Sequence, residues 1–402
     1  MWLWFEAANF RLQNWYYVLL PAHPVERWAG IVLSFATVLP AIMLAERALA
    51  AAGVFRRALR PVIVRPWHLS ASTGLGVAAA GLALAWPRLF FPLVWGVGLL
   101  LAEPLVYRRT PRLSLYRDLE RGEWGRIGRL LVGGLGIGLL WELYNHVAAG
   151  SWIYTVPGLE AVKLFEMPPL GFVGFPVFAL EAWAIYGALC ALGVATPTSG
   201  EVRVSRRRTL VAGALATALS AATLLGMERY AISSTAPRLV DLPGLRAEER
   251  AALRDAGLES PRAVARASPE VLVAHGALDS GRAREVFETA RLVMLRGLGA
   301  EHARTLSALG IAGVCDVVEW DGDALARAVR GATGRVRPTP AEARVWLRAA
   351  QRACVRRGRV RSRRRCAATC PDGTAPRSAR SGWRAPRRWP ARCPPGADRG
   401  SR

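Results

Sequence analysis

Three polar side chains that can move a proton or bind a ligand stand close together in the stretch Trp141-Glu142-Leu143-Tyr144-Asn145-His146. Spacings of three and four residues place Glu142, Asn145 and His146 on one face of a helix. A carboxylate that faces an imidazole can act as a general acid–base pair, or it can form a hydrogen bond that holds the helix end in place. The sequence leaves both interpretations open.

Two more glutamates follow this stretch. Glu166 comes just before Pro168 and Pro169, and an acid next to prolines is typical of the first turn of a helix. Glu181 lies well inside the next apolar run, so we expect it near the centre of a bilayer. An ionisable side chain at that depth is costly and is a functional candidate by default.

We therefore predict one outward-facing cavity that binds or modifies an apolar ligand, such as a lipid or an isoprenoid. Its predicted catalytic residues are Glu142, His146, Glu166 and Glu181. Its predicted ligand-binding residues are Trp141, Tyr144, Asn145, Trp152, Tyr154, Trp183 and Tyr186. The competing interpretation is a buried hydrogen-bond network that orders the helices, and whether the protein is an enzyme stays open.

No metal site or cofactor is predicted. None of the six cysteines has a nearby histidine or the paired two-residue spacing of a zinc site. A disulfide framework is not expected either in a chain of 402 residues. We expect two other glutamates, Glu46 and Glu103, to form ion pairs near the inner membrane interface, because arginines follow them closely in the sequence.

The elements that carry these residues are apolar runs. The chain is 52% hydrophobic and only 21% charged, and its long uncharged runs fill the first 230 residues. Six runs approach the roughly 20 residues that a helix needs to cross hydrocarbon: Trp28–Leu49, Ser70–Trp86, Leu89–Val106, Ile127–Asn145, Phe172–Leu192 and Thr209–Met227. We predict an all-α, polytopic transmembrane bundle over residues 27–230, multi-pass in the cell membrane. Five spans remain possible if residues 70–106 do not cross fully.

Arginines predict the orientation of this bundle. They crowd the loops between the first and second, third and fourth, and fifth and sixth runs, which should therefore be cytoplasmic. The loop over residues 146–171 has one lysine and should face outward, and six spans then place both termini outside. The aromatic start of the chain, residues 1–26, is expected to lie in the lipid headgroup layer without spanning.

Two motif groups carry a resemblance. The Trp-Glu-x-Tyr-Asn opening at Trp141, the Trp-x-Tyr-Thr-Val-Pro centre at Trp152 and the Phe-Glu-Met-Pro close at Phe165 resemble a family of uncharacterised bacterial polytopic membrane proteins, which implies no activity. More distantly, the aromatic loop and the following helix are similar to the membrane-bound lycopene cyclase type. The adjacent acid pair of that type is missing here.

A different pattern follows a linker at residues 231–238. Leu242-Pro243-Gly244-Leu245 and Leu295-Arg296-Gly297-Leu298 recur at an offset of 53, and internal repetition indicates a folded unit. Residues 239–353 resemble a tandem helix-hairpin-helix domain, which implies a soluble helical module that docks a partner. In nucleic-acid-binding forms a Gly-x-Gly turn holds a phosphate. Only the second repeat has one, Gly297-Leu298-Gly299, and eight acids offset the arginines of the first repeat, so a protein partner is favoured and nucleic acid is not expected.

The net charge of +24 has its main source in residues 354–402. Fifteen arginines and two acids occupy the positions from Arg356 onward, which is typical of a solvated, disordered tail. Two functions therefore stand beside each other: a membrane protein that binds a lipid or isoprenoid, and a non-enzymatic anchor or scaffold that presents the helical module to a partner.

Overall fold

A computed structural model describes residues 1–156, 162–196, 205–274 and 278–355 of the chain. Six helical segments within these ranges are long and apolar enough to cross a membrane: Pro24–Ala51, Pro66–Ala85, Pro87–Arg109, Gly125–Val147, Pro169–Ala191 and Arg206–Tyr230. The predicted all-α bundle with six spans is confirmed.

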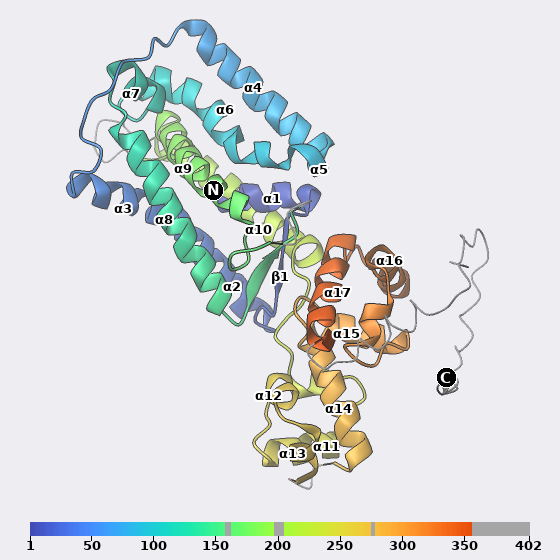
Figure 1. Cartoon of the computed structure of the whole chain (residues 1–402). Coiled ribbons are helices and arrows are strands. Elements are labelled where there is room, and N and C mark those ends of the chain that lie inside the picture. The colour runs from blue at the N-terminus through green and yellow to red at the C-terminus, as the bar shows by residue number, and fades with distance from the viewer. Residues whose placement is uncertain (157–161, 197–204, 275–277, 356–402) are drawn as a thin grey trace, which may run out of the picture. The chain divides into compact units, whose positions relative to one another are not determined.

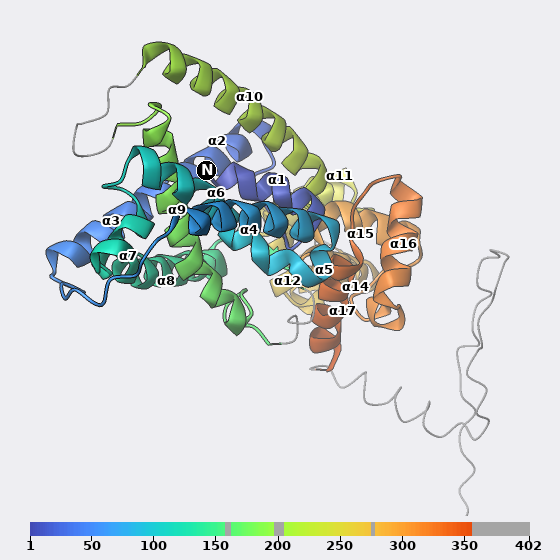
Figure 2. The same ribbon diagram turned by 90° about the horizontal axis from the view of Figure 1, so that it is seen from above.

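The second and third spans form a hairpin, which the sequence left open against one broken helix. Helix α4 (Pro66–Ala85) ends at Trp86, whose φ of −126° and ψ of 67° break the helix, and Pro87 starts the return. The return consists of α5 (Pro87–Phe90), the 3₁₀ turn η1 (Phe91–Leu93) and α6 (Val94–Arg109). Helices α4 and α6 run side by side in both views (Figures 1 and 2). The Ser72 hydroxyl joins them by donating to the Leu100 carbonyl over 2.8 Å.

Helix α9 lies at the centre of the bundle, in contact with α6 on one side and α8 on the other (Figure 1). Glycines allow the close approach of α8: a Cβ added at Gly134 would lie 2.5 Å from the Ala179 Cβ. The other elements of the bundle have these bounds: α2 Pro24–Ala36, α3 Val38–Ala51, α7 Leu115–Arg121, α8 Gly125–Val147, η2 Pro169–Val173, α9 Gly174–Ala191 and α10 Arg206–Tyr230.

The aromatic start of the chain is buried in protein. Helix α1 (Trp2–Leu12) packs against α4 and α10, and Phe5 is completely buried. Its ring stacks on Trp95 of α6 at 5.0 Å and meets Phe178 of α9 edge-on at 5.3 Å. The apolar faces of α6 and α9 therefore cover these rings inside the bundle.

Strands β1 (Trp15–Val18) and β2 (Ser151–Tyr154) pair antiparallel, with Trp15 opposite Tyr154 and Tyr17 opposite Trp152. Side chains alternate between the two faces of a strand. One face therefore carries Trp15, Tyr17, Trp152 and Tyr154, which belong to the core of the bundle. The other face carries Tyr16, Val18 and Ile153, which pack against Val345 of the following helical module.

The helical module begins after α10. Its elements are η3 Leu239–Asp241, α11 Ala247–Asp255, α12 Pro261–Arg266, α13 Pro269–Ala274, α14 Ser280–Val293, α15 Gly299–Ala308, η4 Asp316–Glu319, α16 Gly322–Thr333 and α17 Pro340–Val355. The repeat at an offset of 53 is visible in the backbone: Gly244 and Gly297 both have positive φ, as do Gly257 and Gly310. Ile232 and Thr235, in the predicted linker, form parallel bridges with Tyr17 of β1 and with Leu20, which follows β1.

One disulfide closes the module. Cys315, at the start of η4, is bonded to Cys354 near the end of α17. This disulfide was not predicted, because the two cysteines are 39 residues apart and meet only when the second repeat folds. Cys190 is the free cysteine of the described residues and is buried. The predicted disordered tail, apart from its first two residues, lies outside the described residues.

Glu46 and Glu103 are both buried, and neither forms its contacts with the arginines that follow it closely in the sequence. Glu46 forms an ion pair with Arg129 of α8 at 2.8 Å. Glu103 forms no ion pair within the described part of the chain and instead accepts hydrogen bonds from the start of α7: from the Ser114 hydroxyl at 2.8 Å and from the Leu115 N–H at 3.1 Å. The expected ion pair is thus confirmed for Glu46, with a different partner, and is wrong for Glu103, which caps a helix.

Candidate functional site

Asn145 joins the C-terminal end of α8 to β2. Its side-chain amide donates to the Trp152 carbonyl at 3.0 Å, and its side-chain oxygen accepts from the Trp152 N–H at 2.8 Å. The amide donor and the amide acceptor of Asn145 are thus both bonded to the main chain of Trp152. This residue, predicted to bind a ligand, holds the strand in place.

Glu142 and His146 do not form the predicted acid–base pair. Glu142 is fully buried, and its Oε1 accepts from the Tyr154 hydroxyl at 3.0 Å. His146 is exposed, with its ring 5.5 Å from that of Phe165. The two side chains separate because β2 covers the inner side of α8, while the last turn extends beyond the bundle.

Glu181 is fully buried, as the sequence predicts, but its surroundings differ from the prediction. Its Oε1 accepts from the Gly98 N–H of α6 at 2.7 Å, and a Cβ at Gly98 would lie only 2.4 Å from that oxygen. Trp183 and Tyr186 lie further along α9 and bond to loops at the other end of the bundle: Trp183 donates to the Leu113 carbonyl and Tyr186 to the Thr196 carbonyl. These residues do not meet Glu142.

The remaining predicted residues also separate. Trp141 is half-buried, with its ring 6.4 Å from that of Phe178, whereas Tyr144 is 58% exposed. Trp152 and Tyr154 lie on the bundle face of the strand pair, and the Trp152 indole N–H is buried without a hydrogen-bond partner. The single cavity predicted from the sequence therefore does not form among the described residues.

Another buried carboxyl, that of Glu6, was missed in the sequence analysis. Its Oε1 accepts from the Trp2 indole at 2.8 Å, the Trp15 indole at 3.1 Å and the Tyr17 hydroxyl at 2.5 Å. Burial raises the pKa of Glu6 to about 7, against the opposing effect of these hydrogen bonds. One feature of the sequence could have revealed this site: an acidic residue stands inside a run of tryptophan, phenylalanine and tyrosine. Such an acid must either be exposed to solvent or accept hydrogen bonds from the indole and phenol groups around it.

Glu6 and Glu142 are therefore held in the same way, each by a tyrosine from the same face of the strand pair. Each also has a buried second oxygen without a hydrogen-bond partner. Burial raises the pKa of Tyr17 and Tyr154 well above its usual range, so both phenols stay protonated and remain donors. This acid–phenol cluster joins α1 and α8 to the strand pair at one end of the bundle.

The second glycine turn of the module is buried against the segments around Tyr16 and Ser234. A Cβ at Gly297 would lie 2.5 Å from the Tyr16 hydroxyl, and one at Gly299 would lie 2.2 Å from the Ser234 Cβ. The Trp346 indole donates to the Gly297 carbonyl over 2.8 Å. The turn that could hold a phosphate is thus packed against Tyr16, Ser234 and Trp346.

A buried polar network joins the module to the end of α10. The Ser233 hydroxyl lies 3.2 Å from His302 Nε2 and donates to Glu342 at 3.0 Å. Arg337 pairs with Glu342 and also donates to the carbonyl of Tyr230, the last residue of α10. Burial lowers the pKa of His302 to about 4, so its ring is neutral. Serine, histidine and glutamate can form a nucleophilic triad, but all three are buried here and no substrate can reach them.

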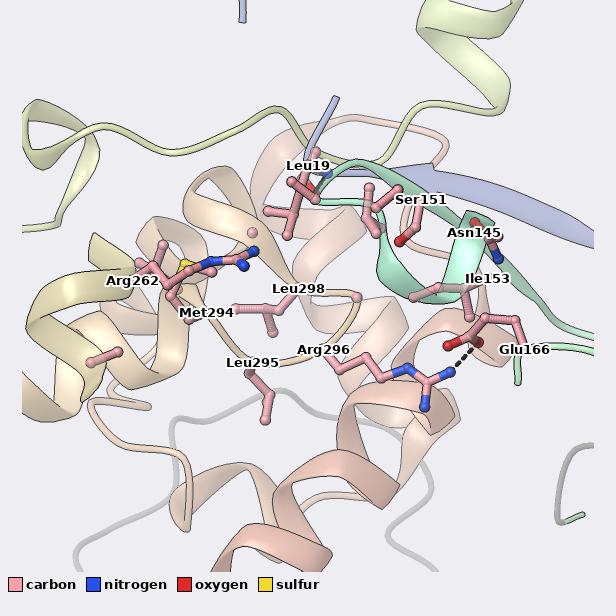
Figure 3. Close-up of a pocket in the computed structure, with 18 of the residues that line it drawn as sticks. Leu19, Asn145, Ser151, Ile153, Glu166, Arg262, Met294, Leu295, Arg296 and Leu298 are labelled. Carbon is pink, nitrogen blue, oxygen red and sulfur yellow. Dashed lines mark hydrogen bonds and ion pairs between the residues drawn. The ribbon is translucent and has the colours of Figure 1, made fainter. Parts of the chain in front are cut away.

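A pocket of about 380 Å³ opens beside this junction (Figure 3). Asn145, His146 and Glu166 reach it from the bundle, and three arginines reach it from the module: Arg262, Arg266 and Arg296. Arg296 forms an ion pair with Glu166, drawn as a dashed line in Figure 3. Arg262 and Arg266 are exposed, and no ion pair is found for either among the described residues. Leu19, Ile153 and Leu298 supply apolar walls.

Among the described residues no group of three histidine, cysteine or acidic side chains could hold a metal ion. Comparisons of the chain with known protein families, with curated proteins and with solved structures find no match. The function is therefore argued from the site itself.

Proposed function

We propose that this multi-pass membrane protein binds an amphipathic ligand with an acidic head, such as an anionic lipid, in the pocket between its bundle and its helical module. One observation carries the proposal: the same pocket contains apolar walls and two arginines, Arg262 and Arg266, for which the described residues supply no ion pair. Guanidinium groups bind carboxylate and phosphate through charge-assisted, often bidentate hydrogen bonds.

The place of the pocket suits such a ligand. Asn145 and His146 belong to the last turn of a membrane-spanning helix, so the pocket lies at the level where lipid headgroups begin. The head would contact the arginines, and an acyl or prenyl chain would follow apolar side chains such as Leu19 and Ile153. Glu142 and Glu181 do not line this pocket, so we propose binding and no chemical step.

We further propose that the pocket and the module face away from the cytoplasm. The arginine-rich loops lie at the ends of the spans opposite the loop that carries Glu166. Arg296 of the module pairs with Glu166, so the module is on the side of that loop. A disulfide between Cys315 and Cys354 supports the same side, because disulfides persist in oxidising compartments.

Labelling with a membrane-impermeant maleimide tests this orientation. In a chain with Cys366, Cys370 and Cys393 changed to serine, a cysteine introduced by Asp255→Cys in the module should react in intact cells. One introduced by Ala58→Cys, in the first arginine-rich loop, should react only after permeabilisation. Both positions are exposed. The reverse pattern would place the module in the cytoplasm and remove the support from the disulfide.

Ligand binding is tested on the full-length protein with fluorescent phosphatidic acid and phosphatidylcholine analogues in detergent. We expect the acidic analogue to bind preferentially and the double variant Arg262→Gln/Arg266→Gln to lose at least about tenfold in affinity. Each charge-assisted hydrogen bond is worth ~1.5–3 kcal/mol, and ~1.4 kcal/mol corresponds to a factor of ten.

The matched control is Arg254→Gln/Arg284→Gln, which removes two exposed arginines of the same module outside the pocket. Equal losses in both double variants would mean that overall charge, not the pocket, governs binding. Equal affinity for the phosphatidylcholine and phosphatidic acid analogues would show that the pocket does not select an acidic headgroup.

The scaffold function remains the second proposal, on one observation. The two repeats, which resemble helix-hairpin-helix motifs, expose different turns: the Gly297–Gly299 turn is covered by the bundle, whereas Gly244 of the first repeat is exposed. A partner protein would therefore meet the first repeat. Loss of function on deletion of residues 239–353, with the Arg262/Arg266 variant fully active, would favour this second proposal.

A further inference from the structure

The loop between α3 and α4, residues 52–65, is built as a rigid platform at the end of the bundle opposite the module. Its main chain is bonded to the connection between α7 and α8: the Leu59 N–H donates to the Gly122 carbonyl and the Val62 N–H donates to the Leu119 carbonyl, each over 2.9 Å. The Trp124 indole donates to the Arg60 carbonyl at 3.3 Å. The loop is therefore held in one conformation.

Two glycines allow this close contact. A Cβ at Gly122 would lie 2.4 Å from the Leu59 carbonyl oxygen, and one at Gly125 would lie 2.4 Å from the Phe55 carbonyl oxygen. Phe55 itself has a φ of +54°, an unfavourable value for a residue with a side chain. The fold thus accepts a strained residue here, and Phe55 is 50% exposed although one side of its ring lies against Gly128 of α8.

A pocket of about 410 Å³ lies over this platform, lined by Gly53, Phe55, Arg56, Arg57, Leu59, Trp124 and Gly125. Arg56 and Arg57 are exposed, and no acidic residue lies between positions 52 and 65. Large apolar side chains are exposed beside them, with Leu59 at 58% and Ile63 at 72%. Exposing these apolar side chains to water is unfavourable. A positively charged pocket beside them is therefore typical of a surface that contacts a lipid bilayer.

We propose that this pocket binds the headgroup of an anionic phospholipid in the cytoplasmic leaflet, with Arg56 and Arg57 as its ligands to the phosphate. Phe55, Leu59 and Trp124 would lie against the glycerol and upper acyl region, as aromatic and aliphatic side chains do at membrane interfaces. Charge complementarity selects the occupant, since the cytoplasmic leaflet is rich in anionic lipid that attracts clustered arginines. This site is separate from the outer pocket and shares with it only the proposed orientation.

The test uses full-length protein in nanodiscs that contain a photoactivatable phosphatidylglycerol in both leaflets, so that it does not depend on orientation. We expect crosslinks to peptides covering residues 53–60 and 122–125. Arg56→Gln/Arg57→Gln should reduce their yield about 25-fold, since each arginine near an anionic surface contributes about fivefold in affinity and the two contributions multiply. The control Arg108→Gln/Arg109→Gln, two exposed arginines at the same end of the bundle, should leave the yield unchanged.

Three outcomes would overturn the inference: no crosslinks to these peptides, equal yield with a phosphatidylcholine analogue, or an equal loss in the control. Competition by inorganic phosphate at millimolar concentration would also overturn it, because it would identify a site for a free anion. Arg262→Gln/Arg266→Gln should lower only the yield of crosslinks to the pocket between bundle and module. The two proposed sites are therefore tested independently.

Discussion

Alanine at position 299 is expected to loosen the helical module from the bundle. The new Cβ would lie 2.2 Å from the Ser234 Cβ, an atom that side-chain rotation cannot move. The backbone at Gly299 also has a φ of +78°, a left-handed conformation that costs a residue with a side chain ~1–2 kcal/mol. Forcing one extra carbon into a packed site costs typically ~1–3 kcal/mol, so Gly299→Ala should destabilise the junction by about 2–5 kcal/mol.

The first repeat and the end of the second supply the matched controls. Gly244 and Gly310 have φ values of +70° and +83°, and a Cβ at either position would meet no atom within 4 Å. Gly244→Ala and Gly310→Ala should therefore show only the backbone cost. Thermal unfolding of the purified protein and limited proteolysis at residues 231–238 measure the difference. If Gly299→Ala behaved like the two controls, the close contact with the bundle would be refuted.

Removal of the Glu6 carboxyl is expected to have the second large effect. Glu6→Ala leaves two indole N–H groups and one phenol, from Trp2, Trp15 and Tyr17, without their common acceptor in a buried site. Each buried group left unsatisfied costs ~1–3 kcal/mol, so we expect a loss of about 3–5 kcal/mol in the free energy of unfolding. Glu6→Gln keeps one acceptor oxygen and should cost less. The exposed Glu259→Ala serves as the control and should have little effect.

The same carboxyl predicts a pH dependence. The pKa of Glu6 in the folded protein is raised to about 7 by burial, above its usual value of 4.5, so the folded state binds the proton more tightly than the unfolded state. Its contribution to stability is therefore complete below about pH 4.5 and is lost as the pH rises through about 7. Melting temperatures between pH 5 and 8 should fall with pH in the wild type, and this decline should be reduced in Glu6→Gln. An identical decline in the variant would assign the pH dependence to another group.

Local composition was sufficient to define the membrane part of this protein. Each of the six spans is a run of apolar residues of bilayer length, and such a run forms a helix in lipid because its backbone groups must be hydrogen-bonded within the segment. The burial of Glu181 followed from its position in such a run. The repeat at an offset of 53 was likewise visible in the sequence, and its paired glycines share a left-handed backbone.

Which residues come together in the acid–phenol cluster and in the pocket depends on contacts between segments that are far apart in the sequence. Trp15 and Tyr154 are opposite each other in the strand pair although 139 positions separate them, and this pairing directs Tyr154 to Glu142 and Tyr17 to Glu6. Helical spacing placed His146 beside Glu142, but it could not show that β2 would cover one of them and leave the other exposed. Arg262 and Arg296 reach the pocket only because the module docks on the bundle, and that docking is decided by the fit of Gly297 and Gly299 against Tyr16 and Ser234. Spacing along one chain segment determines which side chains share a face, whereas only the packing of segments determines what that face meets.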